Sequence, residues 1–183
     1  MKDFDLKTAL AEHRAAVDAV AKMEQQLRQA ATMIRDAFAA GQRLFVCGKR
    51  GSAADAQHFA AELTGRFEKE RRGYPAAALT TDTSALTSIG NDYGFDHIFA
   101  RQLQALARGG DLLVAISTSG NSPNIVKAVE QARVLGVRTI GLLGRDGGAC
   151  AERVDLALTV NAARTARIQE AHVLILHLLC EGL

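Results

Sequence analysis

The chain has 183 residues, of which 48% are hydrophobic and 23% charged, and its 22 basic and 20 acidic residues give a formal net charge of +2. This length suits one domain with a substantial core and an appendage. The near balance of charge argues against a nucleic-acid partner, and the longest apolar runs fall well short of the roughly 20 residues that span a membrane.

Residues 1–40 have the spacing of two amphipathic helices. From Leu6, apolar side chains recur at helical intervals with polar residues between them, and the pattern breaks near residues 23–25 and ends at Gly41, a good C-cap residue. Such a segment cannot bury its apolar stripe alone. The alternation of strands and helices expected from residue 43 onward looks complete without this segment. We therefore expect residues 1–40 to serve oligomerisation and residues 41–183 to form the main α/β domain.

From residue 43 onward, short apolar runs alternate with helical stretches. The runs are RLFVC, AAALT, DLLVAI, RTIGLL and DLALTV, and the expected helices cover residues 52–65, 84–90, 123–135, 147–152 and 167–181. Continuous apolar runs are typical of strands buried on both faces of a parallel sheet. The sequence therefore predicts an α/β fold, a flavodoxin-like three-layer sandwich with a five-stranded parallel sheet and an N-terminal helical extension. Its ligands are expected at the carboxyl ends of the strands.

The first strand runs through a glycine turn into the helix expected over 52–65. Ser52 begins the stretch SAAD, which nearly matches a capping box with Asp55 at the third position. On the same helix, His58 and Glu62 are four residues apart and share a face. Such a pair can ligate a metal or carry a proton, but a plain surface contact has the same spacing.

Two middle segments point first to loops. The stretch FEKERRG, residues 67–73, mixes charges of both signs and predicts a solvated loop. In TSIGNDYGFDHIF, residues 87–99, Asn91 and Asp92 lie between two glycines, which predicts a turn and is also consistent with recognition of hydroxyl groups.

The segment ISTSGNSPN, residues 116–124, follows the DLLVAI run and leads into a helix. Its hydroxyls and free backbone N–H groups precede Pro123, a suitable first helical residue behind Ser122 as N-cap. An ordinary serine-rich turn has a similar composition, but this density of hydroxyls at a helix N-terminus favours phosphate binding. The spacing and lysine of a nucleotide P-loop are absent.

The last helix contains His172 and His177 beside Gln169 and Glu170. Helical geometry places Glu170 almost in line with His177, whereas Gln169 lies roughly 80° away, so spacing alone selects Glu170 as the partner. A histidine within LILHLL suits both a satisfied core position and a functional one.

The cysteines and the N-terminus bear on the compartment. Cys47, Cys150 and Cys180 have no CxxC or metal-knuckle spacing, and the charged stretch MKDFDLKTALAEH lacks the apolar core of a secretory signal. Both features predict reduced, buried thiols in a cytoplasmic protein.

Several motifs in order resemble those of the sedoheptulose 7-phosphate isomerases, a family with the sugar-isomerase (SIS) domain. They are CGKRGSAADAQHFAAELTGRF, ALTTDTSAL, GNDYGF, ISTSGNSPN, GRDGG and RIQEAHVLILH, and the resemblance covers the chain from residue 40 onward. It implies a homotetramer that converts sedoheptulose 7-phosphate into D-glycero-D-manno-heptose 7-phosphate through an enediol, in the synthesis of the heptose of bacterial lipopolysaccharide.

The resemblance also implies roles for single residues. It assigns Glu62 and His177 as the acid–base pair, and one zinc ion per subunit, found in some family members, to His58, Glu62, Gln169 and His177. The resemblance thus selects Gln169, whereas helical spacing alone selects Glu170. The expected substrate-binding residues are Lys49, Arg50, Gly51, Ser52, Glu62, Asn91, Asp92, Ser117, Thr118, Ser119, Ser122 and Gln169.

One turn departs from the family pattern. The family has Gly-Asn-Gly-Gly-Ser where this chain has Gly48-Lys49-Arg50-Gly51-Ser52, so that two small groups are replaced by long cations. These cations can bind the phosphate, change specificity or obstruct the pocket, and we expect reduced turnover of the usual heptose. The alternative is a non-catalytic SIS protein, either a phosphosugar sensor or a tetrameric adaptor similar to the replication-initiator-associating proteins.

Overall fold

The computed structural model describes residues 4–183. The elements follow one another in the order α1 (Leu6–Ala21), α2 (Glu24–Ala39), β1 (Leu44–Gly48), α3 (Gly51–Thr64), β2 (Ala76–Ala78), α4 (Thr83–Tyr93), the 3-10 helix η1 (Phe95–His97), α5 (Ile98–Leu106), β3 (Leu112–Ser117), α6 (Pro123–Val134), β4 (Arg138–Gly144), α7 (Gly148–Ala151), β5 (Leu156–Val160) and α8 (Thr165–Glu181). In the part of the chain that is described, no helix is long and apolar enough to cross a membrane.

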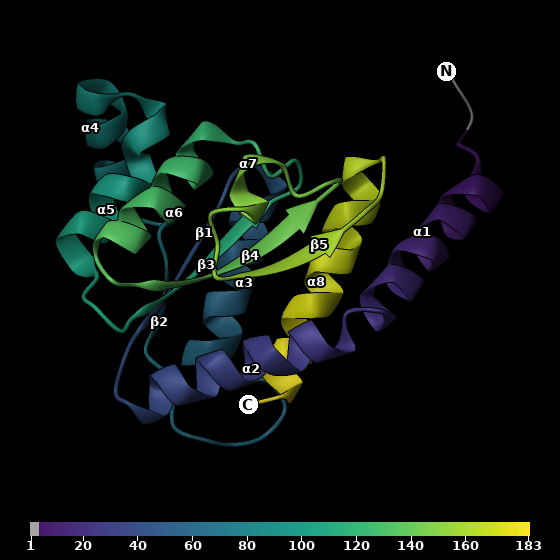
Figure 1. Ribbon diagram of the computed structural model, residues 1–183, viewed down its shortest axis with the longest axis horizontal. Coiled ribbons are helices and arrows are strands. Elements are labelled where there is room, and N and C mark those ends of the chain that lie inside the picture. The colour runs from purple at the N-terminus through teal and green to yellow at the C-terminus, as the bar shows by residue number, and fades with distance from the viewer. Residues whose placement is uncertain (1–3) are drawn as a thin grey trace.

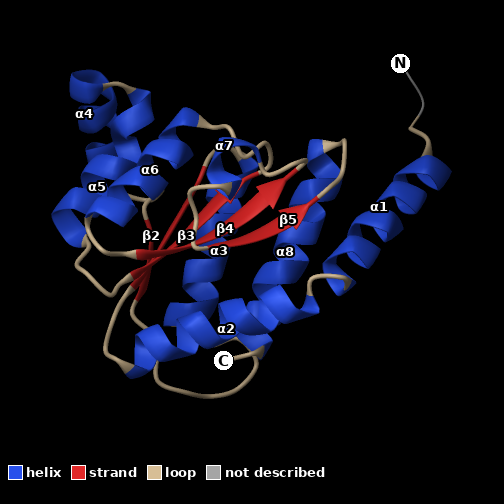
Figure 2. Ribbon diagram, in the orientation of Figure 1, coloured by secondary structure: helices blue, strands red, loops and turns tan. Residues whose placement is uncertain are grey.

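The five strands form one parallel sheet in the order β2-β1-β3-β4-β5. Figure 2 shows helices on both sides of this sheet. Within β1, Leu44 and Val46 pack into the core shared with α3 and α8, whereas Phe45 and Cys47 pack into the core shared with α5 and α6. The predicted flavodoxin-like three-layer sandwich is therefore confirmed, because strands that are apolar on both faces need helices on both faces.

The N-terminal helices pack on their own chain. In α2, Ala30, Ile34 and Ala37 are buried in the same core as α8, so its apolar stripe is covered without a partner. Periodicity predicts that a stripe is buried but cannot identify the surface that covers it. Helix α1 buries only Ala16 and Val20. A subunit contact through residues 1–40 thus remains a prediction, and residues 1–3 lie outside the described chain.

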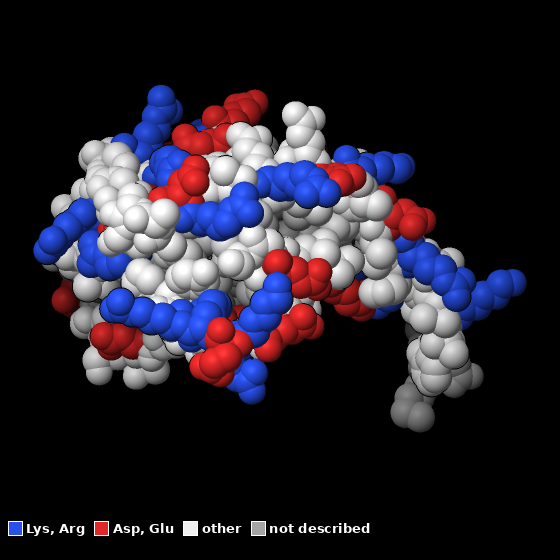
Figure 3. All heavy atoms as spheres, turned by 90° about the horizontal axis from the view of Figure 1, so that it is seen from below, with Lys and Arg blue, Asp and Glu red and all other residues white. Residues whose placement is uncertain are grey.

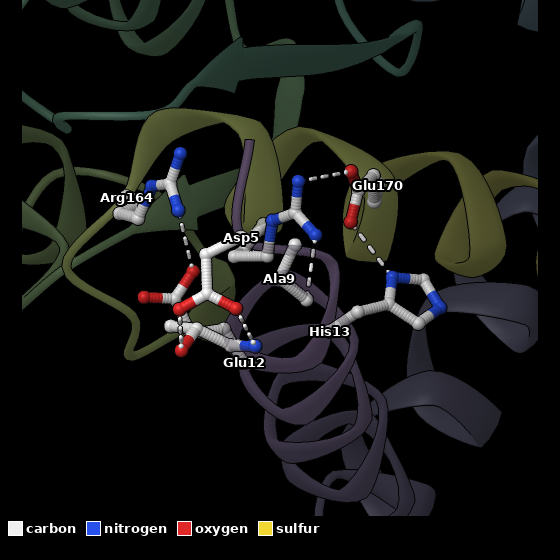
Figure 4. Close-up of polar contacts among 8 residues, drawn as sticks. Asp5, Ala9, Glu12, His13, Arg164 and Glu170 are labelled. Atoms are coloured by element: carbon white, nitrogen blue, oxygen red, sulfur yellow. Dashed lines mark hydrogen bonds and ion pairs between the residues drawn. The ribbon is translucent and has the colours of Figure 1, made fainter. Parts of the chain in front are cut away.

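Polar contacts hold α1 against α8. Glu12 accepts a hydrogen bond from Arg164 at 2.9 Å, and His13 Nδ1 lies 2.7 Å from a carboxylate oxygen of Glu170. Figure 4 shows Glu12 and His13 on α1 beside Arg164, the N-cap of α8, and Glu170 within α8. On the face seen from below in Figure 3, charges of both signs lie close together.

The segment before β3 differs from its prediction. Helix α4 continues to Tyr93, so Asn91 and Asp92 lie in its last turn, and it is Gly94, with φ +85°, that ends the helix. The expected turn at these two residues is wrong. Helix α5 was not predicted from the sequence, because the buried Gln102 interrupts its apolar pattern, and its amide is satisfied by the carbonyls of Leu79 and Ile98.

Two smaller predictions hold. Residues 67–73 form a loop between α3 and β2, and the three cysteines are unpaired and buried. Burial raises the pKa of the Cys150 thiol to about 11 and that of Cys180 to about 12. The strand expected in AAALT is shorter than predicted and covers Ala76–Ala78.

Candidate active site

A cavity of about 210 Å³ opens where β1 and β3 end. These neighbouring strands lead into helices on opposite faces of the sheet, α3 and α6, and such a switch in direction is where doubly wound folds bind ligands. The lining contains hydroxyl groups, two cations and a carboxamide, from Lys49, Arg50, Gly51, Ser52, Ile116, Ser117, Thr118, Ser119, Ser122, Thr165 and Gln169.

The N-terminus of α6 forms one wall of this cavity. Ser122 is the N-cap and Pro123 the first helical residue, as predicted, and the Ser122 side chain makes no capping bond. Its Oγ lies 3.5 Å from the Oγ of the buried Ser117. These hydroxyls are thus left to bind a ligand, and the N-terminal dipole of the helix favours an anion there.

The turn between β1 and α3 supplies the positive charge. Arg50 precedes α3 with φ +59° and ψ −124°, a conformation that suits glycine and costs an arginine about 1–3 kcal/mol. Helix α3 begins at Gly51, so Ser52 lies in the first turn and the capping box expected with Asp55 is absent. Lys49 and Arg50 both line the cavity, whose other polar side chains are uncharged.

Further along, α3 and α8 bring three proton-active side chains together. His58 Nε2 lies 2.9 Å from His177 Nε2 and 3.9 Å from a carboxylate oxygen of Glu62. The two imidazole rings meet edge to face with centroids 5.2 Å apart. The Glu62 side chain is 25% exposed, so its carboxylate is partly shielded yet accessible to a substrate.

Gln169, rather than Glu170, faces this part of the molecule. The Gln169 amide donates to both carboxylate oxygens of Asp55 at 3.2 and 3.3 Å, and a Cβ at Gly51 would collide with the carboxamide. Glu170 instead binds His13 of α1 and Arg167. The preference for Glu170 from spacing is not supported, because the angle around α8 does not reveal that His13 and Arg167 engage its carboxylate.

Asp55 is a site residue that sequence reasoning missed by treating it as a helix cap. Burial raises its pKa above the usual range, although the Gln169 hydrogen bond and the charge of His58 act in the opposite direction. The missed signal is its position three residues before His58 and seven before Glu62, which places all three on one helical face. Thr165, which also lines the cavity, gave no sequence signal that we can identify.

Two predicted binding residues lie elsewhere in the chain. Asn91 and Asp92 are exposed on α4, where the Asn91 amide donates to Asp92 at 2.8 Å, and neither lines the cavity. Helix α4 has no buried residue in this single chain. The structure therefore does not bring these two side chains to the serine cavity.

His172 is a core histidine. It is fully buried, its Nε2 donates to the Leu143 carbonyl at 3.0 Å, and its Nδ1 has no partner. Burial lowers its pKa to about 4, so the ring is neutral and does not serve the site.

A metal ion has a possible donor set here. Imidazole nitrogens and a carboxylate, from His58, His177 and Glu62, are the ligand types that zinc prefers. Within residues 4–183, however, no group of three or more His, Cys, Asp or Glu side chains is already arranged to hold a metal.

Comparisons with known proteins find relatives of this chain in sequence and in structure. The SIS domain family matches residues 10–144, across the boundary expected at residue 40. The phosphoheptose isomerase of Geobacter sulfurreducens is 62% identical over 151 residues, which are 82% of this chain and 80% of that protein, and that of Campylobacter concisus is 51% identical over 97% of this chain and 94% of its own. The structure of phosphoheptose isomerase GmhA from Neisseria gonorrhoeae superposes with a TM-score of 0.89 at 48% identity, covering 95% of this chain and 94% of that one.

Proposed function

The chain belongs to the phosphoheptose isomerases, which carry the SIS domain, and we propose how its own residues perform the reaction of this family. It is an aldose–ketose isomerase that converts sedoheptulose 7-phosphate into D-glycero-D-manno-heptose 7-phosphate. The observation that carries the proposed mechanism is that His58 contacts both Glu62 on α3 and His177 on α8, two helices whose N-terminal ends also line the serine cavity.

The serine cavity binds the phosphate. The hydroxyls of Ser52, Ser117, Thr118, Ser119 and Ser122 donate hydrogen bonds to its oxygens, and the N-terminus of α6 adds its dipole. Lys49, Arg50 and Gly51 complete the wall and contribute two positive charges. Both cations also take up space beside the phosphate, which is why we expect slower turnover than a glycine-rich turn would allow.

The acid–base pair moves the protons. Isomerisation opens the sugar ring, removes a proton from C1 beside the ketone and returns a proton to C2 through an enediol. Glu62 removes the C1 proton, and His177 assists ring opening and protonates the enediolate. The contact between His58 and His177 needs one ring to donate and the other to accept, so at least one of them is neutral.

One zinc ion per subunit fits beside the same residues, with His58, Glu62, Gln169 and His177 as its ligands. When bound, zinc polarises the carbonyl and enediolate oxygens. The Gln169 carboxamide is oriented by Asp55, which lies one helical turn before His58 on α3. A carboxylate that binds a metal is a weaker base, so proton transfer by Glu62 and metal ligation compete.

The active enzyme is a cytoplasmic homotetramer. Exposed Leu6 and Leu10 on α1, and the absence of buried residues on α4, support contacts with further copies. Such contacts allow Asn91 and Asp92 of one subunit to reach the sugar held by another.

The test is turnover itself. Purified protein is incubated with sedoheptulose 7-phosphate, with chelator and with added zinc, and the anomeric aldose signals are followed by NMR. We expect aldose with wild type and none with Glu62→Gln or His177→Gln. If no condition yields aldose with the wild-type chain, the non-catalytic phosphosugar-binding alternative replaces this proposal.

A further inference from the structure

The loop between α3 and β2, residues 65–75, contacts both helices that carry the acid–base pair. Figure 1 shows this loop passing close to the C-terminal end of the chain. We propose that Arg71 in this loop is a positioning residue, which fixes the last turn of α3 and thereby the direction of the Glu62 side chain. The inference rests on the acid–base role proposed for Glu62.

Arg71 binds the end of α3 directly. Its Nη1 donates to the Leu63 carbonyl at 2.9 Å and its Nη2 to the Glu62 carbonyl at 3.0 Å. The last four carbonyls of a helix have no partner within the helix. A guanidinium presents parallel donors in a rigid plane, so it holds two neighbouring carbonyls in one fixed geometry, whereas the donors of an ammonium rotate on a flexible stem.

The guanidinium is itself held in place. It lies 4.1 Å from the centre of the Tyr74 ring, and that ring stacks on Phe38 of α2 with centroids 4.4 Å apart and planes at 4°. The Tyr74 backbone N–H donates to the Leu63 carbonyl at 2.9 Å, and a Cβ at Gly73 would collide with the Thr64 carbonyl. The loop is thus packed tightly against the helix end.

The same loop supports the second member of the pair. Phe67 stacks on the His177 ring with centroids 5.6 Å apart and planes at 26°. Residues of this loop therefore contact the backbone of Glu62 on one helix and the ring of His177 on the other. A displacement of the loop would change the position of the carboxylate relative to the two imidazoles.

This placement predicts a specific kinetic signature. Ser52 lines the phosphate cavity at the N-terminal end of α3, about 15 Å along the helix axis from Glu62. Loss of Arg71 should therefore misplace the base and leave phosphate binding intact. Since a misplacement of about 1 Å can cost about 100-fold in rate, we expect Arg71→Met to lower kcat by about 10- to 100-fold with KM within about 2-fold of wild type.

The experiment compares Arg71→Met, Arg71→Lys and the matched control Arg72→Met by steady-state kinetics with sedoheptulose 7-phosphate. Arg72 is exposed in the same loop, and no hydrogen bond of its side chain is found among the described residues. Arg71→Lys should fall between Arg71→Met and wild type, and Arg72→Met should match wild type. Equal kcat in Arg71→Met and wild type, equal losses in the Arg71→Met and Arg72→Met variants, or a KM that rises as kcat falls would each overturn the proposal.

Two additions keep the result interpretable. If Arg71→Met does not fold, Tyr74→Leu and Arg71→Lys take its place, and both should lower kcat without changing KM. Glu62→Gln is measured in parallel. Wild-type activity in Glu62→Gln would refute the acid–base assignment itself, whereas an inactive Glu62→Gln beside a fully active Arg71→Met would refute this inference alone.

Discussion

The buried ring of His172 should make the stability of the protein depend on pH. Its Nε2 binds the Leu143 carbonyl and its Nδ1 has no partner, so protonation would place an unpaired charge in the core. Burial lowers the pKa from 6.5 to about 4. Because the folded pKa is depressed, the unfolded chain takes up the proton first, and stability is full above pH 6.5 and falls as pH decreases towards 4.

The size of the effect follows from the shift. A difference of about 2.5 pKa units corresponds to about 3.4 kcal/mol once pH is below 4, and to about 2 kcal/mol between pH 7.5 and pH 5. The substitution His172→Gln keeps a donor for the Leu143 carbonyl and removes the titration. Over this range the variant should therefore lose about 2 kcal/mol less of its free energy of unfolding than wild type does.

The assay is urea unfolding followed by circular dichroism at several pH values and one fixed protein concentration. The fixed concentration matters because subunit association contributes to apparent stability. His97→Gln, which changes a partly exposed ring, is the control and should follow wild type. If wild type and His172→Gln lose stability in parallel between pH 7.5 and pH 5, the reasoning from the orphaned Nδ1 is refuted.

Three further predictions concern the site. The double change Lys49→Asn and Arg50→Gly should raise kcat/KM for sedoheptulose 7-phosphate, because it opens the cavity; equal or lower kcat/KM would exclude obstruction by these cations. Ser122→Ala removes one phosphate donor worth about 1 kcal/mol, so KM should rise about 5-fold at nearly constant kcat in steady-state assays. His58→Ala should lower the zinc content of purified protein measured by atomic absorption, and a zinc content equal to that of wild type would remove His58 from the ligand set.

The sequence predicts the sheet well because its central strands obey a simple physical rule. DLLVAI after its first residue, and RTIGLL after its first two, have no polar side chain, and only a strand covered on both faces needs that pattern. The Ser122–Pro123 start of α6 was equally predictable, since N-cap and N1 preferences are local. Both predictions depend on neighbours in the sequence alone.

The remaining errors arise from contacts that are distant in the sequence. The Leu79 carbonyl, one of the two that satisfy Gln102 in α5, lies outside that helix. Spacing favoured Glu170 over Gln169 because the sequence shows only the angle of each residue around α8. It does not show that the carboxylate of Glu170 binds His13 on α1. The role proposed for Arg71 was hidden for the same reason. The sequence of a loop with mixed charges does not reveal that one of its arginines binds carbonyls at the end of α3.

The two ends of the α3 helix dipole have opposite signs, and an arginine lies beside each end. At the N-terminus the helix dipole is positive, and Arg50 and Lys49 add charge of the same sign where the phosphate binds. At the C-terminus the dipole is negative and would repel the carboxylate of Glu62, but the guanidinium of Arg71 binds the very carbonyls that create this field. One helix can therefore face a phosphate anion at its start and carry a carboxylate base near its end, because Arg71 binds the carbonyls beside that base.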